Sequence, residues 1–485
     1  MSSSSRPSLP PPVSSRPSLP PASSRPFWLS YSSRPSLLPL SSGKTLAVFA
    51  AAVLLLLIPV VLIELPVLAH THGSVLFPQD SAFVDITVAR NLAFYKVWGL
   101  SKYAFQSASS SLLYPLVLAP VFFIFGAHLV VPLAVNFFAA LGFLFVLQRT
   151  LIRFGVGALR QLLILVAAIG VTVLPLLVVS GLEYTLQLLC VMLFLERVIL
   201  FNNITRSVYI YAALAVAARY EDLLIIAVAC VVVGLLRGPK PALKLALIAV
   251  SPVLLFGGVS LFKGSYFFPN SLLLGPYPAP ALGLAIPVLA AVALLLWRYS
   301  RQSQPKRLQA TPRLALLTLG LLVIPFGARN LDGLTHFQRD CDRIYDQQYL
   351  TARFVHRYYF KWGIGINDPG VVSWFSEGRK LDFTGVASSD VTRCKKEHEW
   401  SPAWADSLSR KMGVGTAIVS DPWFRPDQLP MWNKVASWKI PASGAAPGAG
   451  EVFFYAINKY DTARLRKSLH DYQPLLPAGV AVRYY

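Results

Sequence analysis

Residues 78–92 read Pro-Gln-Asp-Ser-Ala-Phe-Val-Asp-Ile-Thr-Val-Ala-Arg-Asn-Leu. This stretch places two carboxylates, Asp80 and Asp85, and one guanidinium, Arg90, shortly after the first long apolar segment of the chain. Ionisable groups at a membrane are costly unless they pair with one another or line a cavity. We therefore expect the chain to be organised around these charges, held at a membrane surface.

The composition is that of a multi-spanning membrane protein. Of the 485 residues, 55% are hydrophobic and 14% are charged, and the mean hydropathy is +0.54, whereas a soluble chain is about 25% charged. The formal net charge is +21, but the cations lie largely in short loops between apolar segments, where they orient helices in the membrane. The sequence therefore predicts a lipid bilayer as a partner and argues against nucleic acid.

The N-terminal segment has a different character from the rest. Residues 1–43 contain a degenerate Ser-Ser-Arg-Pro-Ser-Leu-Pro repeat, and Pro and Ser at this density cannot bury a core. The segment is predicted to be a disordered, cytoplasmic tail rich in Ser, Pro and Arg. The apolar run at 45–69 is long enough to cross about 30 Å of hydrocarbon, and it is too long for a cleavable signal peptide.

The distribution of arginine and lysine predicts nine membrane spans within residues 44–328, because it leaves the cations mostly in loops on one side. The expected spans are 45–69, 128–147, 161–179, 184–200, 208–218, 223–236, 245–262, 281–297 and 314–328. Residues 70–127 form the first external loop. Its apolar part, 112–126, contains Pro115 and Pro120 and suits a helix lying at the interface, with a true span as the alternative.

An odd number of spans puts residues 329–485 outside the cytoplasm. Polar residues become frequent there, and the pattern predicts a mixed α/β domain. The expected elements are a helix over 343–360 and strands over 363–367, 416–420 and 452–457. Cys341 and Cys394 fall in this region, so a disulfide between them is left open.

Four groups of polar side chains fall at segment ends on the same predicted side of the membrane. Their members are Asp80, Asp85 and Arg90; Glu183; Arg219, Glu221 and Asp222; and Asn270, which follows Lys263. For any single carboxylate, a loop charge or an ion pair between helices is the simpler explanation. The coincidence of four groups on one side favours a shared site, because such groups usually line a cavity or pair.

These residue types suit the transfer of a sugar from a phosphate-linked lipid to a hydroxyl. The reaction needs a base for the acceptor proton and cations for the leaving phosphate, a role that suits arginine. Asp80 is the expected base, with Asp85 in reserve, and Arg90 and Arg219 are the expected phosphate contacts.

The remaining site residues receive supporting roles. Glu183 and Glu221 are expected in the wall of the cavity. Asn270 is assigned either to sugar hydroxyls or to a helix cap, and the cap is favoured. A divalent cation, Mg²⁺ or Mn²⁺, bridging carboxylate and phosphate is left open.

At these residues the chain resembles the GT-C superfamily of polyprenyl-phosphate-dependent glycosyltransferases, in its arabinofuranosyltransferase-like and mannosyltransferase-like branch. The family's Asp-Asp-Ala-Phe-Ile motif, which runs into Ala-Arg-Asn-Leu, is matched at residues 80–84 and 89–92, with Ser81 in place of the second carboxylate. Weaker matches lie at residues 180–183, 219–221, 268–271, 367–370 and 381–385. Gly275 stands where the family often has lysine.

The resemblance covers most of the chain from residue 45 onward. It implies an inverting hexosyl- or pentosyltransferase of a bacterial inner membrane, with a polyprenyl-phosphate sugar as donor. The acceptor would be a glycan, lipid or protein of the cell envelope, and the first-loop aspartate would be the base. The N-terminus would be cytoplasmic and the C-terminal domain periplasmic or extracellular.

Two other functions remain as alternatives. A transporter or flippase for a lipid-linked substrate would predict an inverted internal repeat, and none is visible in the sequence. A non-catalytic envelope assembly protein would explain the changes at Ser81 and Gly275 as signs of lost activity. The expected fold is thus an α-helical polytopic membrane protein of about nine transmembrane helices, GT-C-like, with a C-terminal extracytoplasmic α/β domain.

Overall fold

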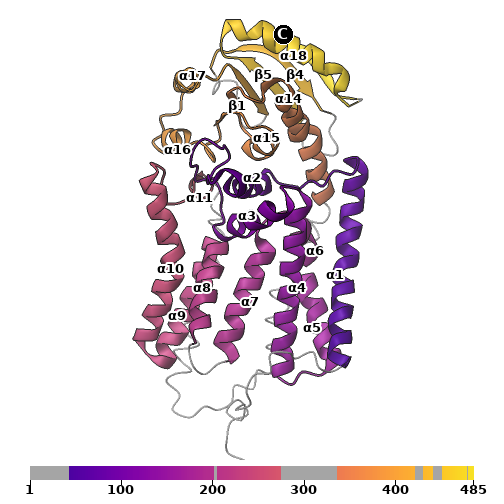
Figure 1. The fold of residues 1–485 in the computed structure, drawn as a ribbon, viewed down its shortest axis with the longest axis vertical. Helices are drawn as coiled ribbons and strands as arrows, with labels where there is room; N and C mark the ends of the chain where they lie inside the picture. The colour runs from indigo at the N-terminus through magenta and orange to yellow at the C-terminus, as the bar shows by residue number, and fades with distance from the viewer. Residues whose placement is uncertain (1–42, 201–204, 275–335, 421–429, 441–449, 478) are drawn as a thin grey trace, which may run out of the picture.

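The structure, a computed structural model, describes residues 43–200, 205–274, 336–420, 430–440, 450–477 and 479–485. The described part is a bundle of helices with a small α/β domain at one end, and two crosswise helices lie between them (Figure 1). The predicted spans 281–297 and 314–328 lie outside the described residues, as does the tail up to residue 42.

The helices of the bundle follow the predicted apolar segments closely. They are α1 (Gly43–His70), α4 (Val130–Arg153), α5 (Ala158–Val171), α6 (Leu174–Val179), α7 (Tyr184–Leu200), α8 (Arg206–Ala218), α9 (Leu223–Arg237) and α10 (Pro239–Phe262). Among the described helices, α1, α4 and α10 are long and apolar enough to cross a membrane. At 24 residues, α4 and α10 each extend about 36 Å, more than the hydrocarbon thickness.

The predicted span 161–179 is two helices instead of one. The chain leaves the helical conformation at Val173, whose φ of 49° lies in the left-handed region. Pro175 follows at the start of α6, where its missing N–H and its ring prevent α5 from continuing. The 14 residues of α5 extend only about 21 Å, so α5 alone is too short to cross.

Two helices occupy the predicted first external loop. They are α2 (Asp80–Tyr95) and α3 (Leu113–Phe125). The 13 residues of α3 extend about 20 Å, too short to cross about 30 Å of hydrocarbon, and α3 lies across the end of the bundle beneath α2 (Figure 1). The sequence predicted the apolar segment of α3 but not the helix α2.

The C-terminal region is built on a six-stranded mixed sheet in the order β2-β1-β3-β5-β4-β6. The strands are β1 (Ile364–Ile366), β2 (Lys380–Asp382), β3 (Thr416–Ser420), β4 (Asn433–Lys439), β5 (Glu451–Ala456) and β6 (Ala481–Tyr484). Strand β1 pairs in parallel with β2 and β3, and the remaining pairs are antiparallel. The predicted strands at 363–367, 416–420 and 452–457 are confirmed as β1, β3 and β5, whereas β2, β4 and β6 were not predicted.

Helices cover both faces of this sheet. The predicted helix over 343–360 is confirmed as η4 (Ile344–Tyr349) and α14 (Leu350–Tyr359), and the others are α15 (Pro369–Phe375), α16 (Ser389–Lys396), α17 (Pro402–Lys411) and α18 (Lys459–Tyr472). On one face Trp438 packs against Phe454, with ring centroids 4.5 Å apart, and stacks on Tyr472. On the other face Phe383 packs on Trp432.

Hydrogen bonds between α2 and α15 join the α/β domain to the helix bundle. The Asp80 carboxylate accepts hydrogen bonds from the backbone N–H groups of Gly370, at 2.9 Å, and Val371, at 2.8 Å. The Arg90 guanidinium donates to the carbonyls of Ser373, at 3.0 Å, and Trp374. An anion at the start of a helix and a cation at its end satisfy its orphan groups and complement its dipole.

The cysteines form no disulfide. The thiols of Cys341 and Cys394 are both buried and free, and Cys341 approaches the Leu76 carbonyl. The bridge that the sequence left open is therefore absent.

We predict that Gly370→Ala loosens the contact between α2 and α15. A Cβ atom at this position would lie 2.2 Å from the backbone oxygen of Asp80, and overpacking of this kind costs about 1–3 kcal/mol. Thermal unfolding of the purified protein in detergent should therefore show a lower Tm. Gly258→Ala is the matched control, because nothing lies within 4 Å of its Cβ position; equal Tm values for both variants would contradict the tight contact.

Candidate functional site

The four predicted polar groups all lie at the end of the bundle nearest the α/β domain. The Leu112 N–H donates to the Ala217 carbonyl at 3.0 Å, and the Asn270 N–H donates to the Ser107 carbonyl at 2.8 Å. The loop that follows α2 therefore connects α8 with the short helix α11 (Asn270–Leu274). Within this end, the predicted residues separate into two clusters.

The first cluster, which we call the acid–arginine cluster, consists of Asp85, Glu183, Arg219 and Glu221. Glu183 is fully buried, and its Oε1 accepts a hydrogen bond of 2.7 Å from Arg219 Nη1. The same guanidinium donates to both carboxylate oxygens of Glu221, at 2.7 and 3.1 Å. It also stacks over the ring of Tyr184, with Cζ 4.8 Å from the centroid.

Local backbone geometry explains why these side chains meet. Gly181 has a φ of +71°, and a Cβ atom there would lie 2.4 Å from the Phe77 ring, so the turn before α7 requires glycine. That turn places Glu183 directly in front of α7. A single 3₁₀ turn, η3 (Tyr220–Asp222), brings Glu221 back beside Arg219.

Asp85 supplies the third carboxyl group of this cluster. It is 1% exposed, and its Oδ1 accepts a hydrogen bond of 2.6 Å from Ser109 Oγ. Burial, followed by the charge of Glu183, raises the pKa of Asp85 well above its ordinary range. The Glu183 pKa is raised by burial and lowered by Arg219, so of these two carboxyl groups Asp85 is the one whose protonated form is more strongly favoured.

Asp222, beside this cluster, is also buried. Its Oδ1 accepts a hydrogen bond of 2.8 Å from Gln187 Nε2. Burial raises the pKa of Asp222 to about 7.

The second cluster, which we call the strand-end cluster, consists of Asp80, Asp368 and Asp382. Asp368 follows β1, and Asp382 ends β2; both face the start of α2. Asp382 is saturated by the N–H groups of Thr384 and Ala387, both at 2.8 Å. Asp368 accepts only a hydrogen bond of 3.2 Å from Ser420 Oγ among the contacts of the described residues.

Asp80 affects both the hydrogen bonding and the pKa of Asp368. Asp368 is the residue before α15, but its side chain makes no capping hydrogen bond, because the Asp80 carboxylate already accepts from the N–H groups there. Burial raises the pKa of Asp80 to about 6, against the two backbone hydrogen bonds. Burial and then the Asp80 charge raise the pKa of Asp368 to about 7.

The strand-end cluster lies at the switch point of the sheet. The chain leaves β1 toward β2 on one side and returns to β3 on the other, so β1 and β3 are neighbours whose connections diverge. Ligands of α/β sheets bind outside the carboxyl ends of strands at such points. Asp368 and Asp382 were read from sequence only as turn residues; acidic residues after two successive strands were the signal that would have found them.

The other predicted residues have different surroundings. Arg90 is engaged with α15, as described above, and its guanidinium lies 5.1 Å from the Trp374 ring centroid. Asn270 is buried, and its amide donates to Ser389 Oγ of α16 at 3.4 Å. Its side-chain oxygen has no hydrogen-bond partner among the described residues.

A cavity of about 800 Å³ lies at the other end of α2, bounded by α3, α8 and α10. We call it the apolar groove. Its lining includes Trp98, Phe105, Phe256 and the ammonium-bearing Lys96 and Lys263. The 16 residues of α2 extend about 24 Å, which separates this groove from Asp80. No local sequence pattern predicts the groove, because its lining residues come from separate segments of the chain.

Among the described residues, no group of three or more His, Cys, Asp or Glu side chains is arranged to hold a metal ion. Residues 340–455 match a family model described as a domain of unknown function (DUF8728). This match covers most of the sheet of the α/β domain and none of the bundle. No curated protein matches the chain, and no solved structure matches it.

We predict that the strand-end cluster makes the protein less stable at pH 8.5 than at pH 5.5. The pKa of Asp368 rises from 3.8 to about 7 on folding, so between these values the folded state binds more protons than the unfolded state. Its stability therefore falls as pH rises through this window. Asp368→Asn should reduce the difference in Tm between pH 5.5 and pH 8.5.

The exposed Asp390 of α16 provides the control for this measurement. Asp390→Asn should retain the wild-type difference in Tm between the two pH values. A wild-type difference in Asp368→Asn as well would show that this carboxyl does not titrate in the window.

We predict that Arg219→Met destabilises the protein by about 3–5 kcal/mol, because it leaves the buried Glu183 without its cation. Glu221→Gln should cost less than about 1 kcal/mol, since Glu221 is 56% exposed and exposed ion pairs contribute little. Denaturant unfolding in detergent measures both. The double variant Arg219→Met, Glu183→Gln should recover part of the loss; no recovery would mean that Arg219 stabilises through packing alone.

Proposed function

We propose that this protein is an integral membrane glycosyltransferase of the GT-C type, which moves a sugar from a polyprenyl-phosphate donor to an envelope acceptor. The proposal includes a nine-span topology in a bacterial inner membrane, with the α/β domain outside the cytoplasm. The observation that carries it is the strand-end cluster. It sets a carboxylate of near-neutral pKa between a helix bundle and the switch point of a sheet.

Asp80 is the proposed general base. A base works best when its pKa lies near the working pH, and the pKa of Asp80 is raised to about 6. Each of its oxygens accepts one N–H, which leaves lone pairs free for an acceptor hydroxyl. The pKa of Asp85 is raised well above its ordinary range by burial and then by the Glu183 charge, so Asp85 fits the role of reserve base poorly and is instead assigned to holding the acid–arginine cluster together.

In the proposed step the acceptor oxygen attacks the anomeric carbon of the donor sugar. Its proton passes to Asp80, a glycosidic bond forms, and the bond from the anomeric carbon to the phosphate oxygen breaks. The polyprenyl phosphate leaves with the electron pair, and the configuration inverts. Arg343, whose charge acts on Asp368, is a candidate for contact with the phosphate, because its half-exposed side chain is held only by an exposed ion pair of 3.5 Å with Asp340.

Arg90 and Arg219 are less suited to phosphate binding in this arrangement than the sequence suggests. Each guanidinium already donates to fixed acceptors, the carbonyls of α15 and two carboxylates. In the proposal they position α15 and the ends of α7 and α8. Glu183, Glu221 and Asn270 likewise hold the surrounding elements in place.

The apolar groove favours a second candidate function, a carrier of lipid-linked substrates that performs no transfer. Its volume lies within the range of small-molecule sites, about 300–1,000 Å³. Its apolar walls suit a lipid chain, and Lys96 and Lys263 suit an anionic headgroup. Because it lies about 24 Å from Asp80, a lipid bound there would not be the donor in the transfer step.

We predict that Asp80→Asn lowers sugar transfer at least about 100-fold, the usual contribution of a general base. The assay uses the full-length protein in lipid nanodiscs with radiolabelled polyprenyl-phosphate sugars and envelope extracts as acceptor. The asparagine oxygen still accepts one N–H of α15 and the other N–H loses its acceptor, so the Tm should fall and activity is compared well below the Tm of the variant. Wild-type activity should also fall as the pH drops below about 6, the pKa of Asp80.

The variant Asp85→Asn distinguishes the role of Asp85 from that of Asp80. It replaces a carboxyl group of raised pKa by a neutral amide of the same shape, so transfer should fall less than about tenfold. Equal activity of wild type and Asp80→Asn would remove Asp80 as the base. Binding of the labelled lipid without any transfer would favour the carrier function.

A further inference from the structure

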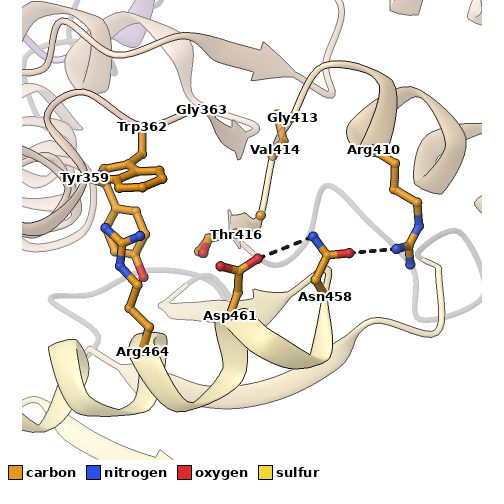
Figure 2. A pocket seen from close by; sticks show the side chains of 11 residues that line it. Tyr359, Trp362, Gly363, Arg410, Gly413, Val414, Thr416, Asn458, Asp461 and Arg464 are labelled. Atoms are coloured by element: carbon orange, nitrogen blue, oxygen red, sulfur yellow. Dashed lines mark hydrogen bonds between the residues drawn. The ribbon is translucent and has the colours of Figure 1, made fainter.

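A second cavity lies in the α/β domain at the opposite ends of the strands from the strand-end cluster. Its volume is about 380 Å³, and it opens between the end of α14, the loop before β3 and the start of α18 (Figure 2). Gly363 precedes β1, and Gly415 precedes β3, so the amino ends of two parallel strands form its floor. No role in the proposed transfer step falls on any of its residues.

One side of this cavity carries a fixed row of polar groups. Arg410 donates to the Asn458 side-chain oxygen at 2.7 Å, and the Asn458 amide donates to Asp461 Oδ2 at 3.4 Å. Arg410 is itself held by Asp406 at 2.8 Å. A Cβ atom on Gly415 would lie 2.4 Å from the Asp461 carboxylate, so glycine there leaves the space beside that carboxylate open.

The other side is aromatic. Trp362 is 56% exposed, and the Arg464 guanidinium stacks on it with Cζ 4.0 Å from the ring centroid. Tyr359 is 4% exposed, and its buried hydroxyl has no hydrogen-bond partner of good geometry among the described residues, although the hydroxyls of Thr416 and Ser468 lie close to it. Figure 2 shows Tyr359, Thr416 and Asp461 facing the same space.

A buried hydroxyl without a partner costs stability, and such groups in native proteins call for an explanation. A ligand with several hydroxyl groups would provide a hydrogen-bond partner for the Tyr359 hydroxyl. Its hydroxyls would donate to Asp461 and accept from Tyr359 and from the Asn458 amide, and its carbon skeleton would lie along Trp362. A phosphate suits the cavity poorly, because the Arg410 guanidinium is already paired with Asp406 and Asn458. The Arg464 guanidinium is stacked on Trp362, and a phosphate beside it would also face the Asp461 carboxylate.

We propose that this cavity binds a saccharide, one or two sugar units in size, away from the site of transfer. The proposed transferase function enters only in the source of the saccharide, which would be a distal part of the acceptor glycan. Saccharide binding here would hold a growing glycan on the α/β domain while its end reaches Asp80.

The test uses the full-length protein in detergent, with methyl glycosides of glucose, galactose, mannose and arabinose and their linear oligomers as probes. Saturation-transfer NMR detects binding, and calorimetric titration gives Kd. At least one probe should bind. Tyr359→Phe should weaken it about tenfold, the effect of one lost hydrogen bond, and Asp461→Asn should weaken it further.

Tyr460→Phe is the matched control, because Tyr460 lies on α18, is 95% exposed and is not part of the lining. It should bind the probe like wild type. Tyr359→Phe should lower the Tm only slightly, since its hydroxyl makes at most weak hydrogen bonds to Thr416 and Ser468. Absence of binding by every probe, or equal Kd values for Tyr359→Phe and wild type, would overturn the proposal.

The two proposals fail in different experiments. Saccharide binding by a protein that transfers no sugar would leave this site intact and remove the transferase. Transfer by a protein that binds none of the probes would leave the transferase intact and remove this site.

Discussion

The arrangement of the helix bundle and the α/β domain depends on the hydrogen bonds that α2 makes to both ends of α15. A helix of seven residues has too few internal hydrogen bonds to be stable alone, and most of its end groups lack intrahelical partners. Asp80 and Arg90 supply those partners from a helix almost 300 positions earlier in the chain. Displacing the α/β domain would leave a carboxylate, a guanidinium and several backbone groups unpaired at a desolvated contact, which makes the contact strongly preferred.

The same contact between α2 and α15 influences the hydrogen bonding and the pKa values of the strand-end cluster. In most helices the residue before the first turn caps its own N–H groups, and Asp368 occupies that position in α15. Because Asp80 takes those N–H groups, Asp368 is left with Ser420 and beside a second carboxylate. Burial at this contact, and then the charge of Asp80, raise the pKa of Asp368, because burial and a neighbouring like charge both disfavour the ionised carboxyl. The raised pKa values are thus a consequence of how the domain is attached.

Much of the architecture is predictable from the sequence, because long apolar segments and strongly periodic strands carry their own local signal. The bundle helices, the helix over 343–360 and three strands of the sheet follow from such signals. The meeting of Asp85, Glu183 and Arg219 follows from their shared position at segment ends. The pairing of Asp80 with the start of α15 cannot be predicted in this way, because a helix cap that comes from a distant segment leaves no sequence pattern near Asp80 or near α15. The raised pKa of Asp85 could not be predicted from the sequence either, because it depends on complete burial and then on the charge of Glu183.

In the proposed function, a single carboxylate both caps α15 and accepts a proton, which would link attachment to catalysis. When Asp80 is ionised, its hydrogen bonds to Gly370 and Val371 are charge-assisted and therefore strong. Once it takes a proton from an acceptor hydroxyl, these bonds become neutral and weaker, and the interaction with the α15 dipole is lost. In the proposed transfer, the charged cap is restored only when Asp80 releases this proton, which ties the reset of the base to the attachment of the domain.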